Sequence, residues 1–149
     1  IYGMTGGQYS PTTPVGARAA TSPWGNIDIP FNVSELVKGA GATYVARGHV
    51  GSGVQLERLI RGGLTHKGFS VIEVLSNCHT QYGRRNRIPD AIDLIEHISK
   101  STVSVRQAEK MSPEELKDKY AVGLLHQDTE RTEYCDDYNK VIEHAQLER

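Results

Sequence analysis

The stretch Phe69-Ser70-Val71-Ile72-Glu73-Val74-Leu75 decides the fold class of this chain of 149 residues. It is largely apolar and rich in β-branched residues, which is typical of a strand in a sheet covered on both faces. Just before it, residues 53–66 carry apolar side chains at helical spacing. This pattern predicts a helix with Ser52 as its N-cap and Gly68 just beyond its end. Residues 43–47 predict the strand that precedes this helix.

The same alternation continues on both sides of these elements. The expected elements are a short helix over 34–40 capped near Asn32 and stopped at Gly41, a loop over 76–88, a helix opened by Pro89, a capping box at Ser112-Pro113-Glu114-Glu115, a strand over 121–125 and a terminal helix over 134–147. Because strands and helices alternate, we expect an α/β fold, with a mainly parallel sheet and flanking helices.

Charge and glycine are unevenly distributed along the chain. The net charge is −1, but residues 1–85 carry +4 and residues 86–149 carry −5, and 13 of the 15 glycines precede residue 69. This weak basic bias is not the clustered stripe of a nucleic-acid-binding protein, so no nucleic-acid partner is expected. No apolar run reaches the roughly 20 residues of a membrane span, and nothing is typical of a signal peptide.

The two cysteines, Cys78 and Cys135, form no CxxC motif and do not indicate a disulfide scaffold. We therefore expect a reducing, cytoplasmic location. The chain starts at Ile1, not at a methionine, and a motif-like segment follows at once, which predicts a fragment of a longer protein.

Two loops carry the candidate chemistry. Residues 1–31 are rich in glycine and proline and predict a long loop, which leaves an expected strand at Ile1-Tyr2. Its adjacent glycines allow backbone amides to approach an anion or cofactor, although a plain surface loop has the same composition. It is neither a Walker A nor a GxGxxG sequence, so it predicts no nucleotide site.

The second loop, over 76–88, contains Cys78 beside His79 and three arginines, Arg84, Arg85 and Arg87. A thiolate among positive charges at the end of a strand is either a nucleophile or a metal ligand, and the alternative is an incidental free cysteine. Two cysteines cannot complete an iron–sulfur cluster, since such clusters usually take four. Any cluster therefore needs ligands from outside this chain.

Four blocks follow one another in order: IYGMTGGQYSPTTP (1–14), TSPWGN (21–26), GATYVARG (41–48) and GFSVIEVLSNCHTQYGRRN (68–86). Together they resemble the β subunits of 2-oxoacid:ferredoxin oxidoreductases. The joint presence of the GMTGGQ loop and the Cys-x-Thr-x-Tyr-Gly-Arg stretch is most similar to the 2-oxoglutarate type. The resemblance implies the C-terminal part of a thiamine diphosphate-binding domain of the pyrimidine/pyrophosphate type, over 1–125. Within it, 1–31 would be the active-site loop region and 126–149 a helical tail.

The resemblance also implies an enzyme with thiamine diphosphate, Mg²⁺ and one 4Fe–4S cluster. The backbone carbonyl that completes the metal shell falls on Ile1, and Gly3 and Met4 fall on positions beside the thiazolium ring and substrate. Met4 and Thr5 are the residues implied to be catalytic. Where some relatives hold the substrate carboxylate with a lysine, this chain has Gly6. The residues implied to bind the cofactor are Ile1, Tyr2, Gly3, Met4, Thr5, Gly6, Gly7 and Gln8.

Cys78 falls on the fourth ligand of the cluster, and the other ligands and the main metal-binding motif are expected upstream of residue 1. The implied reaction is oxidative decarboxylation of 2-oxoglutarate with CoA to succinyl-CoA and CO₂, with electrons passing through the cluster to ferredoxin. The implied partners are an α subunit, ferredoxin, CoA and the 2-oxoacid; a membrane is not among them. The arginines near Cys78 are implied to steer an acidic ferredoxin, to hold CoA phosphates, or simply to face solvent.

Three alternatives stay open. The substrate is pyruvate or a branched-chain 2-oxoacid; the chain is a truncated, non-catalytic assembly module; or it is a glycine-rich anion-binding domain without a redox role. Taken alone, the fragment is expected to be inactive. Trp24 is expected to anchor the long loop by packing. The histidines other than His79 are expected at the surface (His49, His66, His97, His126 and His144).

Overall fold

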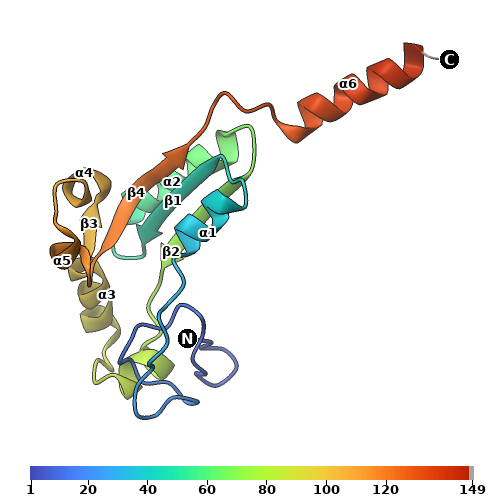
Figure 1. The fold of residues 1–149 in the computed structure, drawn as a ribbon. Helices are drawn as coiled ribbons and strands as arrows, with labels where there is room; N and C mark the ends of the chain where they lie inside the picture. The colour runs from blue at the N-terminus through green and yellow to red at the C-terminus, as the bar shows by residue number, and fades with distance from the viewer. Residues whose placement is uncertain (148–149) are drawn as a thin grey trace.

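The chain folds around one four-stranded sheet, seen in a computed structural model that describes residues 1–147 (Figure 1). Its strands, in the spatial order β2-β1-β4-β3, are β1 (Tyr44–His49), β2 (Ser70–Leu75), β3 (Thr102–Ser104) and β4 (Tyr120–Gln127). The β1–β2 and β3–β4 pairs are parallel, whereas β1 and β4 are antiparallel. The predicted α/β class is confirmed, and the antiparallel pairing in the middle makes the sheet mixed.

Helices flank this sheet. They are α1 (Val33–Gly39), α2 (Gly53–Thr65), the π-helical turn η1 (His79–Gly83), α3 (Ala91–Lys100), α4 (Val105–Ala108), α5 (Pro113–Leu116) and α6 (Tyr134–Leu147). Figure 1 shows the N-terminal loop beside η1 at one end of the sheet, while α6 projects beyond the other end. The elements η1, β3 and α4 were not expected from the sequence, because each is too short for its periodicity to be recognised.

Capping side chains explain where several helices begin. The Asn32 side chain accepts a hydrogen bond from the Glu35 amide, and Ser112 and Glu115 form the predicted capping box. Ser52 is the N-cap residue of α2, as predicted, although its side chain makes no capping hydrogen bond. The prediction that Pro89 opens a helix was wrong, because α3 begins at Ala91 and Asp90 caps it.

Two further boundaries differ from expectation. Helix α2 ends at Thr65, with His66 already extended as its C-cap, so Gly68 lies past the end of the helix. Its φ of +140° shows that the turn into β2 is what needs a glycine there. At the other end of the chain, the terminal helix occupies 134–147 as predicted.

Strand β1 is buried along its whole length, and its alternating side chains face two different environments. On one face, Tyr44 and Ala46 pack with Leu59 of α2, and the Tyr44 hydroxyl donates to the Leu59 carbonyl over 2.9 Å. On the other face, Arg47 is 8% exposed and its Nε lies 2.7 Å from Glu73 Oε2. Helices α2 and α1 therefore cover opposite faces of the sheet.

The Arg47 side chain holds this second face together through polar contacts. It donates to the Ser34 hydroxyl over 2.9 Å, to Asn32 Oδ1 over 3.2 Å and to the Ala121 carbonyl over 3.3 Å. These contacts join the start of α1 to β1, β2 and β4. The sequence analysis missed this network, since an arginine inside the strand signal 43–47 gives no sign of burial on its own.

The expectation that the histidines lie at the surface was wrong for His49, and in part for His66 and His126, which are half-buried. His49 closes β1 and is buried, at 7% exposure. His66 is half-buried, and its Nε2 lies 2.8 Å from the Thr43 hydroxyl. His49 is the last residue of a buried strand, and His66 is the C-cap of α2. The spacing of histidines along the sequence does not indicate either position.

Candidate functional site

Residues 2–8 form a closed loop at the start of the chain. The Tyr2 amide donates to the Gln8 carbonyl over 2.9 Å, and the Gly7 amide donates to the Tyr2 carbonyl over 2.9 Å. Tyr2 pairs with Gln8 alone, so the expected strand at Ile1-Tyr2 is an isolated bridge in the described chain. Gly6 and Gly7 adopt φ values of +121° and +85°, which side-chain-bearing residues rarely adopt.

The tip of this loop is polar and open. Met4 is fully exposed. The Thr5 hydroxyl donates to Gln8 Oε1 over 2.7 Å, and Gln8 Nε2 donates back to the Thr5 carbonyl over 2.9 Å. These two hydrogen bonds between Thr5 and Gln8 fix the shape of the loop and leave Met4 uncovered. The tip of the loop is therefore accessible to a ligand.

The rest of the N-terminal loop is held by buried polar groups. Thr13 is completely buried, and the Asn26 side chain donates to the Thr13 carbonyl over 2.9 Å. The backbone N–H of Asn26 also donates to the Ala17 carbonyl over 2.8 Å. Trp24 is 93% exposed, so the prediction that it anchors the loop by packing was wrong. Asn26 takes that role because its amide group satisfies backbone groups that lack secondary-structure partners.

Cys78 lies in the second loop, three residues after β2 ends. It is the N-cap of the π-helical turn η1, and its carbonyl accepts from the amides of Tyr82 and Gly83 over 2.9 and 3.0 Å. π-Helical turns are rare and occur often at functional sites. Gly83 is buried with the Ile88 carbonyl against it, so the turn is packed tightly at its end.

The two loops meet at Gly3 and Cys78. A Cβ atom on Gly3 would lie only 2.8 Å from Cys78 Sγ, and one on Gly7 would lie 2.7 Å from Gln81 Oε1. Both glycines therefore allow a backbone approach that a side chain would block. Of the residues predicted to form the site, the structure brings residues 2–8 and Cys78 into one place.

The environment of Cys78 favours its thiolate. Burial raises the pKa of the Cys78 thiol, but hydrogen bonds from the backbone at Tyr82 and Gln81 and from the Thr80 hydroxyl, 3.8 Å away, outweigh it. The pKa of Cys78 is consequently below its ordinary value. Cys135 lies exposed on α6. The negative charge of Glu133, and to a lesser extent its hydrogen bond to Cys135, raise the pKa of this second thiol. Only Cys78 thus has the character of a metal ligand or reactive thiol.

Asn86 and Arg18 join the two loops a second time, and the sequence analysis missed this pair. The Arg18 amide donates to Asn86 Oδ1 over 2.8 Å, and Asn86 Nδ2 donates to the Arg18 carbonyl over 3.0 Å. Asn86 Nδ2 also donates to the Tyr82 carbonyl over 2.9 Å. No local signal relates residues 68 positions apart, although asparagine side chains often hydrogen-bond to the backbone of loops and turns.

A family model described as the C-terminal TPP binding domain of thiamine pyrophosphate enzymes matches residues 1–74. The 2-oxoglutarate synthase subunit KorB of Methanothermobacter marburgensis is 43% identical over 96% of this chain and 50% of that protein. The subunit of the same name in Methanocaldococcus jannaschii is 43% identical over 99% of this chain and 54% of that protein. The chain belongs to the β-subunit family of 2-oxoacid:ferredoxin oxidoreductases.

A solved structure of this oxidoreductase family has the same fold. It is the 2-oxoglutarate:ferredoxin oxidoreductase from Magnetococcus marinus with 2-oxoglutarate, coenzyme A and succinyl-CoA bound. It is 27% identical to this chain, with a TM-score of 0.77, and the match covers 98% of this chain and 50% of that one. The chain spans about half the length of the curated relatives it matches.

The described residues supply part of what the cofactors of this oxidoreductase family require. The Ile1 carbonyl accepts no hydrogen bond from any residue within 1–147, which leaves its oxygen available to a cation. Cys78 supplies one thiol, whose pKa is lowered by its surroundings. No group of three or more histidine, cysteine or carboxylate side chains that could hold a metal occurs in 1–147. The N-terminal loop therefore fits the TPP binding domain that the family model describes. A metal held by three or more such side chains would need ligands from outside 1–147.

The Gly3–Cys78 contact yields a testable expectation for this β-subunit chain. Gly3→Ala places a methyl group against Cys78 Sγ, so the sulfur or the loop must move. We expect a loss of stability of about 1–3 kcal/mol, as for other overpacked sites. A displacement near 1 Å is also expected to lower the activity of the assembled enzyme by about 10²-fold. Urea unfolding and steady-state assays measure the two effects.

Gly53→Ala is the matched control, because a Cβ atom at Gly53 meets nothing within 4 Å. It is expected to leave both stability and activity close to those of the unaltered protein. If Gly3→Ala behaves like Gly53→Ala in both assays, the close contact between the two loops is wrong.

Proposed function

We propose that this chain is part of the β subunit of a 2-oxoglutarate:ferredoxin oxidoreductase. The complete enzyme would oxidatively decarboxylate 2-oxoglutarate with CoA to succinyl-CoA and CO₂, and pass the electrons through a 4Fe–4S cluster to ferredoxin. The observation that carries the proposal is the contact of Cys78 Sγ with Gly3 in the loop implied to bind the cofactor. The residue proposed to bind the cluster therefore lies directly against the loop proposed to hold thiamine diphosphate and the substrate.

The N-terminal loop would hold the organic cofactor. Thiamine diphosphate, when bound, supplies the carbanion that attacks the 2-oxo carbon. The Ile1 carbonyl would complete the shell of Mg²⁺ on the diphosphate. Residues Tyr2 to Gln8 would line the cofactor, and the exposed Met4 and Thr5 would be the side chains that contact the thiazolium ring and substrate. Gly6 and Gly7 would let backbone amides approach it closely.

Cys78 would hold the iron–sulfur cluster with three further thiolates from outside the described residues. Its lowered pKa supports this role, since the thiolate is the ligand form of cysteine. Cys135 is exposed on a projecting helix and is not assigned to the cluster (Figure 1). The hydrogen bonds to the Cys78 sulfur would also tune the cluster's reduction potential.

The domain organisation follows from this assignment. Residues 1–125 would belong to the thiamine diphosphate-binding domain, with 1–31 as its active-site loop region, and 126–149 would form a tail whose main element is α6. An α subunit, ferredoxin, CoA and the 2-oxoacid would be the partners, in the cytoplasm. No helix within residues 1–147 has both the length and the hydropathy to span a bilayer.

An assay of the complete enzyme tests this function. The β subunit is purified with its α subunit, and ferredoxin reduction is followed with 2-oxoglutarate, pyruvate or a branched-chain 2-oxoacid, with and without CoA. We expect CoA-dependent reduction that is fastest with 2-oxoglutarate. Faster turnover with pyruvate or a branched substrate would move the assignment to that type of enzyme.

The non-catalytic alternative gives a different result. If the chain only supports assembly, its complex with the α subunit forms but neither binds thiamine diphosphate nor reduces ferredoxin with any 2-oxoacid. Isothermal titration calorimetry with thiamine diphosphate and Mg²⁺ on the same complex decides between the two readings.

A further inference from the structure

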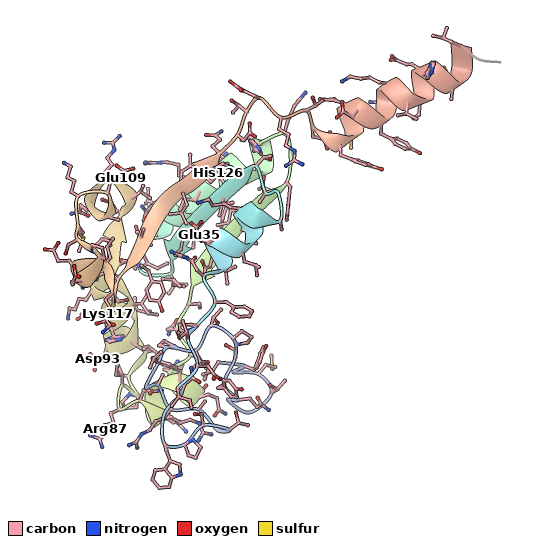
Figure 2. All side chains as sticks on the ribbon, viewed as in Figure 1. Glu35, Arg87, Asp93, Glu109, Lys117 and His126 are labelled. Carbon is pink, nitrogen blue, oxygen red and sulfur yellow. The ribbon has the colours of Figure 1, made fainter. Side chains whose placement is uncertain are left out.

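Helix α6 carries an apolar stripe that stays open to solvent in the described chain. Its members are Tyr134, Tyr138, Val141 and Ala145, spaced by four, three and four residues. The first three are 73%, 52% and 61% exposed, and Ala145 is exposed as well. Figure 2 shows side chains of α6 extending into open space on both sides of its ribbon. This spacing places all four residues on one face of the helix, as in the seam of a coiled coil.

The linker before α6 directs the helix away from the sheet of its own chain (Figure 1). Asp128 Oδ1 accepts hydrogen bonds from two amides of the following turn over 2.9 and 3.2 Å. Arg131 Nη1 donates to the Gly41 carbonyl over 3.2 Å, and Lys67 Nζ lies 4.0 Å from Asp136 Oδ2 in the first turn of α6. Because these contacts attach the base of α6 to the end of the sheet, the stripe is left for a partner outside the chain.

The stripe is complementary to itself when two copies of α6 run antiparallel. If Tyr134 of one copy faces Ala145 of the other, Tyr138 faces Val141, and two-fold symmetry repeats both pairs. Each layer then combines a large side chain with a smaller one, which is how facing helices fill a seam without voids. A parallel pair would place each tyrosine against its own copy and Ala145 against Ala145, so large and small layers would be separated.

The residues beside the stripe favour the same arrangement. Asp137 and His144 flank it on one side, and in the antiparallel register each lies opposite the other in the second copy. An imidazole can donate a hydrogen bond to a carboxylate, so this pairing is favourable. On the other flank, Ile142 lies opposite Cys135, and both are apolar or nearly so. The antiparallel register therefore brings no like charges together across the seam.

We propose that α6 docks against α6 of a second copy of this chain as an antiparallel helix pair. The pair would join two α–β units through the tails of their β-subunit chains. The inference goes beyond the proposed function, since it concerns assembly and not the reaction. A helix of 14 residues is about 21 Å long, so the contact is small and we expect it to form reversibly.

Disulfide cross-linking in the α–β complex tests the pairing. The β-subunit chain carries Tyr134→Cys and Ala145→Cys in a Cys135→Ser background, and the complex is oxidised with diamide. The two new cysteines lie about 16.5 Å apart along one helix, which is too far for a disulfide within one chain. We expect a covalent dimer of β-subunit chains from this variant and none from either single cysteine variant.

A charge placed in the seam gives a second readout. Val141→Glu, added to the two cysteines, puts an unpaired carboxylate into both central layers. We expect it to lower the initial rate of cross-linking between β-subunit chains by about tenfold or more. Asn139→Glu is the matched control, because it adds the same charge to the same helix outside the stripe. It should leave the rate unchanged.

Other products would overturn the proposal. Absence of the covalent dimer from the double cysteine variant contradicts the pairing, as does an equal rate with Val141→Glu. A dimer from Tyr134→Cys alone would indicate a parallel pair. A product that joins the β-subunit chain to the α subunit would assign the stripe to that subunit. None of these readouts requires turnover, so a complex that fails to reduce ferredoxin contradicts the proposed function alone.

Discussion

Cys78→Ser is expected to abolish ferredoxin reduction by the assembled oxidoreductase, with a loss of at least about 10²-fold, since clusters of this type rely on thiolate ligands. Serine keeps the size of the side chain and its place against Gly3, so the fold around η1 should survive. The lost group is the sulfur whose thiolate is favoured by the hydrogen bonds around it. Iron and acid-labile sulfide content, together with the rate of ferredoxin reduction, measure the effect.

Cys135→Ser provides the matched comparison. Cys135 is exposed on α6, and the negative charge of Glu133 disfavours its thiolate. We expect full iron content and full activity in this variant. Retention of both properties by Cys78→Ser would refute the cluster role of Cys78. It would favour the reading of the chain as an anion-binding domain without redox chemistry.

Arg47→Met is expected to destabilise the chain by about 3–5 kcal/mol, the usual cost of removing one partner of a buried ion pair. Methionine fills much of the same volume, but it removes the ion-pair partner of Glu73, which keeps only the hydrogen bond from the Ser34 hydroxyl. It also removes the donors to Ser34, Asn32 and Ala121. A loss of this size is a large part of the roughly 5–15 kcal/mol that stabilises a typical domain. Urea unfolding followed by circular dichroism gives the change in the free energy of unfolding.

A double variant separates the ion pair from simple packing. Arg47→Met with Glu73→Leu removes both charges, so no carboxylate is left unpaired in the sheet. We expect this variant to recover much of the stability lost in Arg47→Met, because replacing both partners of a buried pair costs less than removing one. If the double variant is as unstable as Arg47→Met, the loss of stability comes from the missing hydrogen bonds to α1 and β4. It does not then come from the unpaired carboxylate of Glu73.

The sequence predicted the individual residues of the candidate site, but it did not predict how the two loops that carry them come together. The glycines at positions 6 and 7 and the cysteine after the strand 69–75 are local signals, because backbone freedom and thiol chemistry belong to single residues. The close approach of Gly3 to Cys78 is not local. It depends on how the long N-terminal loop folds back, and that loop is held by buried groups such as Thr13 and Asn26.

Two wrong expectations have the same origin. Trp24 was expected to anchor its loop by packing, yet hydrogen bonds from the Asn26 side chain hold the loop. His49 was expected at the surface because the histidines show no ligand spacing, yet it is the last residue of a strand buried along its length. In both cases burial is decided by segments that are distant in sequence.

By itself, the sequence determined the α/β class, the position of most helices and strands, and the resemblance to the β-subunit family, because periodicity, caps and contiguous motifs are properties of neighbouring residues. The tertiary structure alone decided the antiparallel pairing of β1 with β4, the buried Arg47–Glu73 pair and the approach of Arg18 to Arg85 and Arg87. These contacts are made between residues that lie from 15 to more than 80 positions apart in the sequence. They form only when the whole chain packs. No local pattern encodes such contacts, since they form only when the sheet and its covering helices close around them.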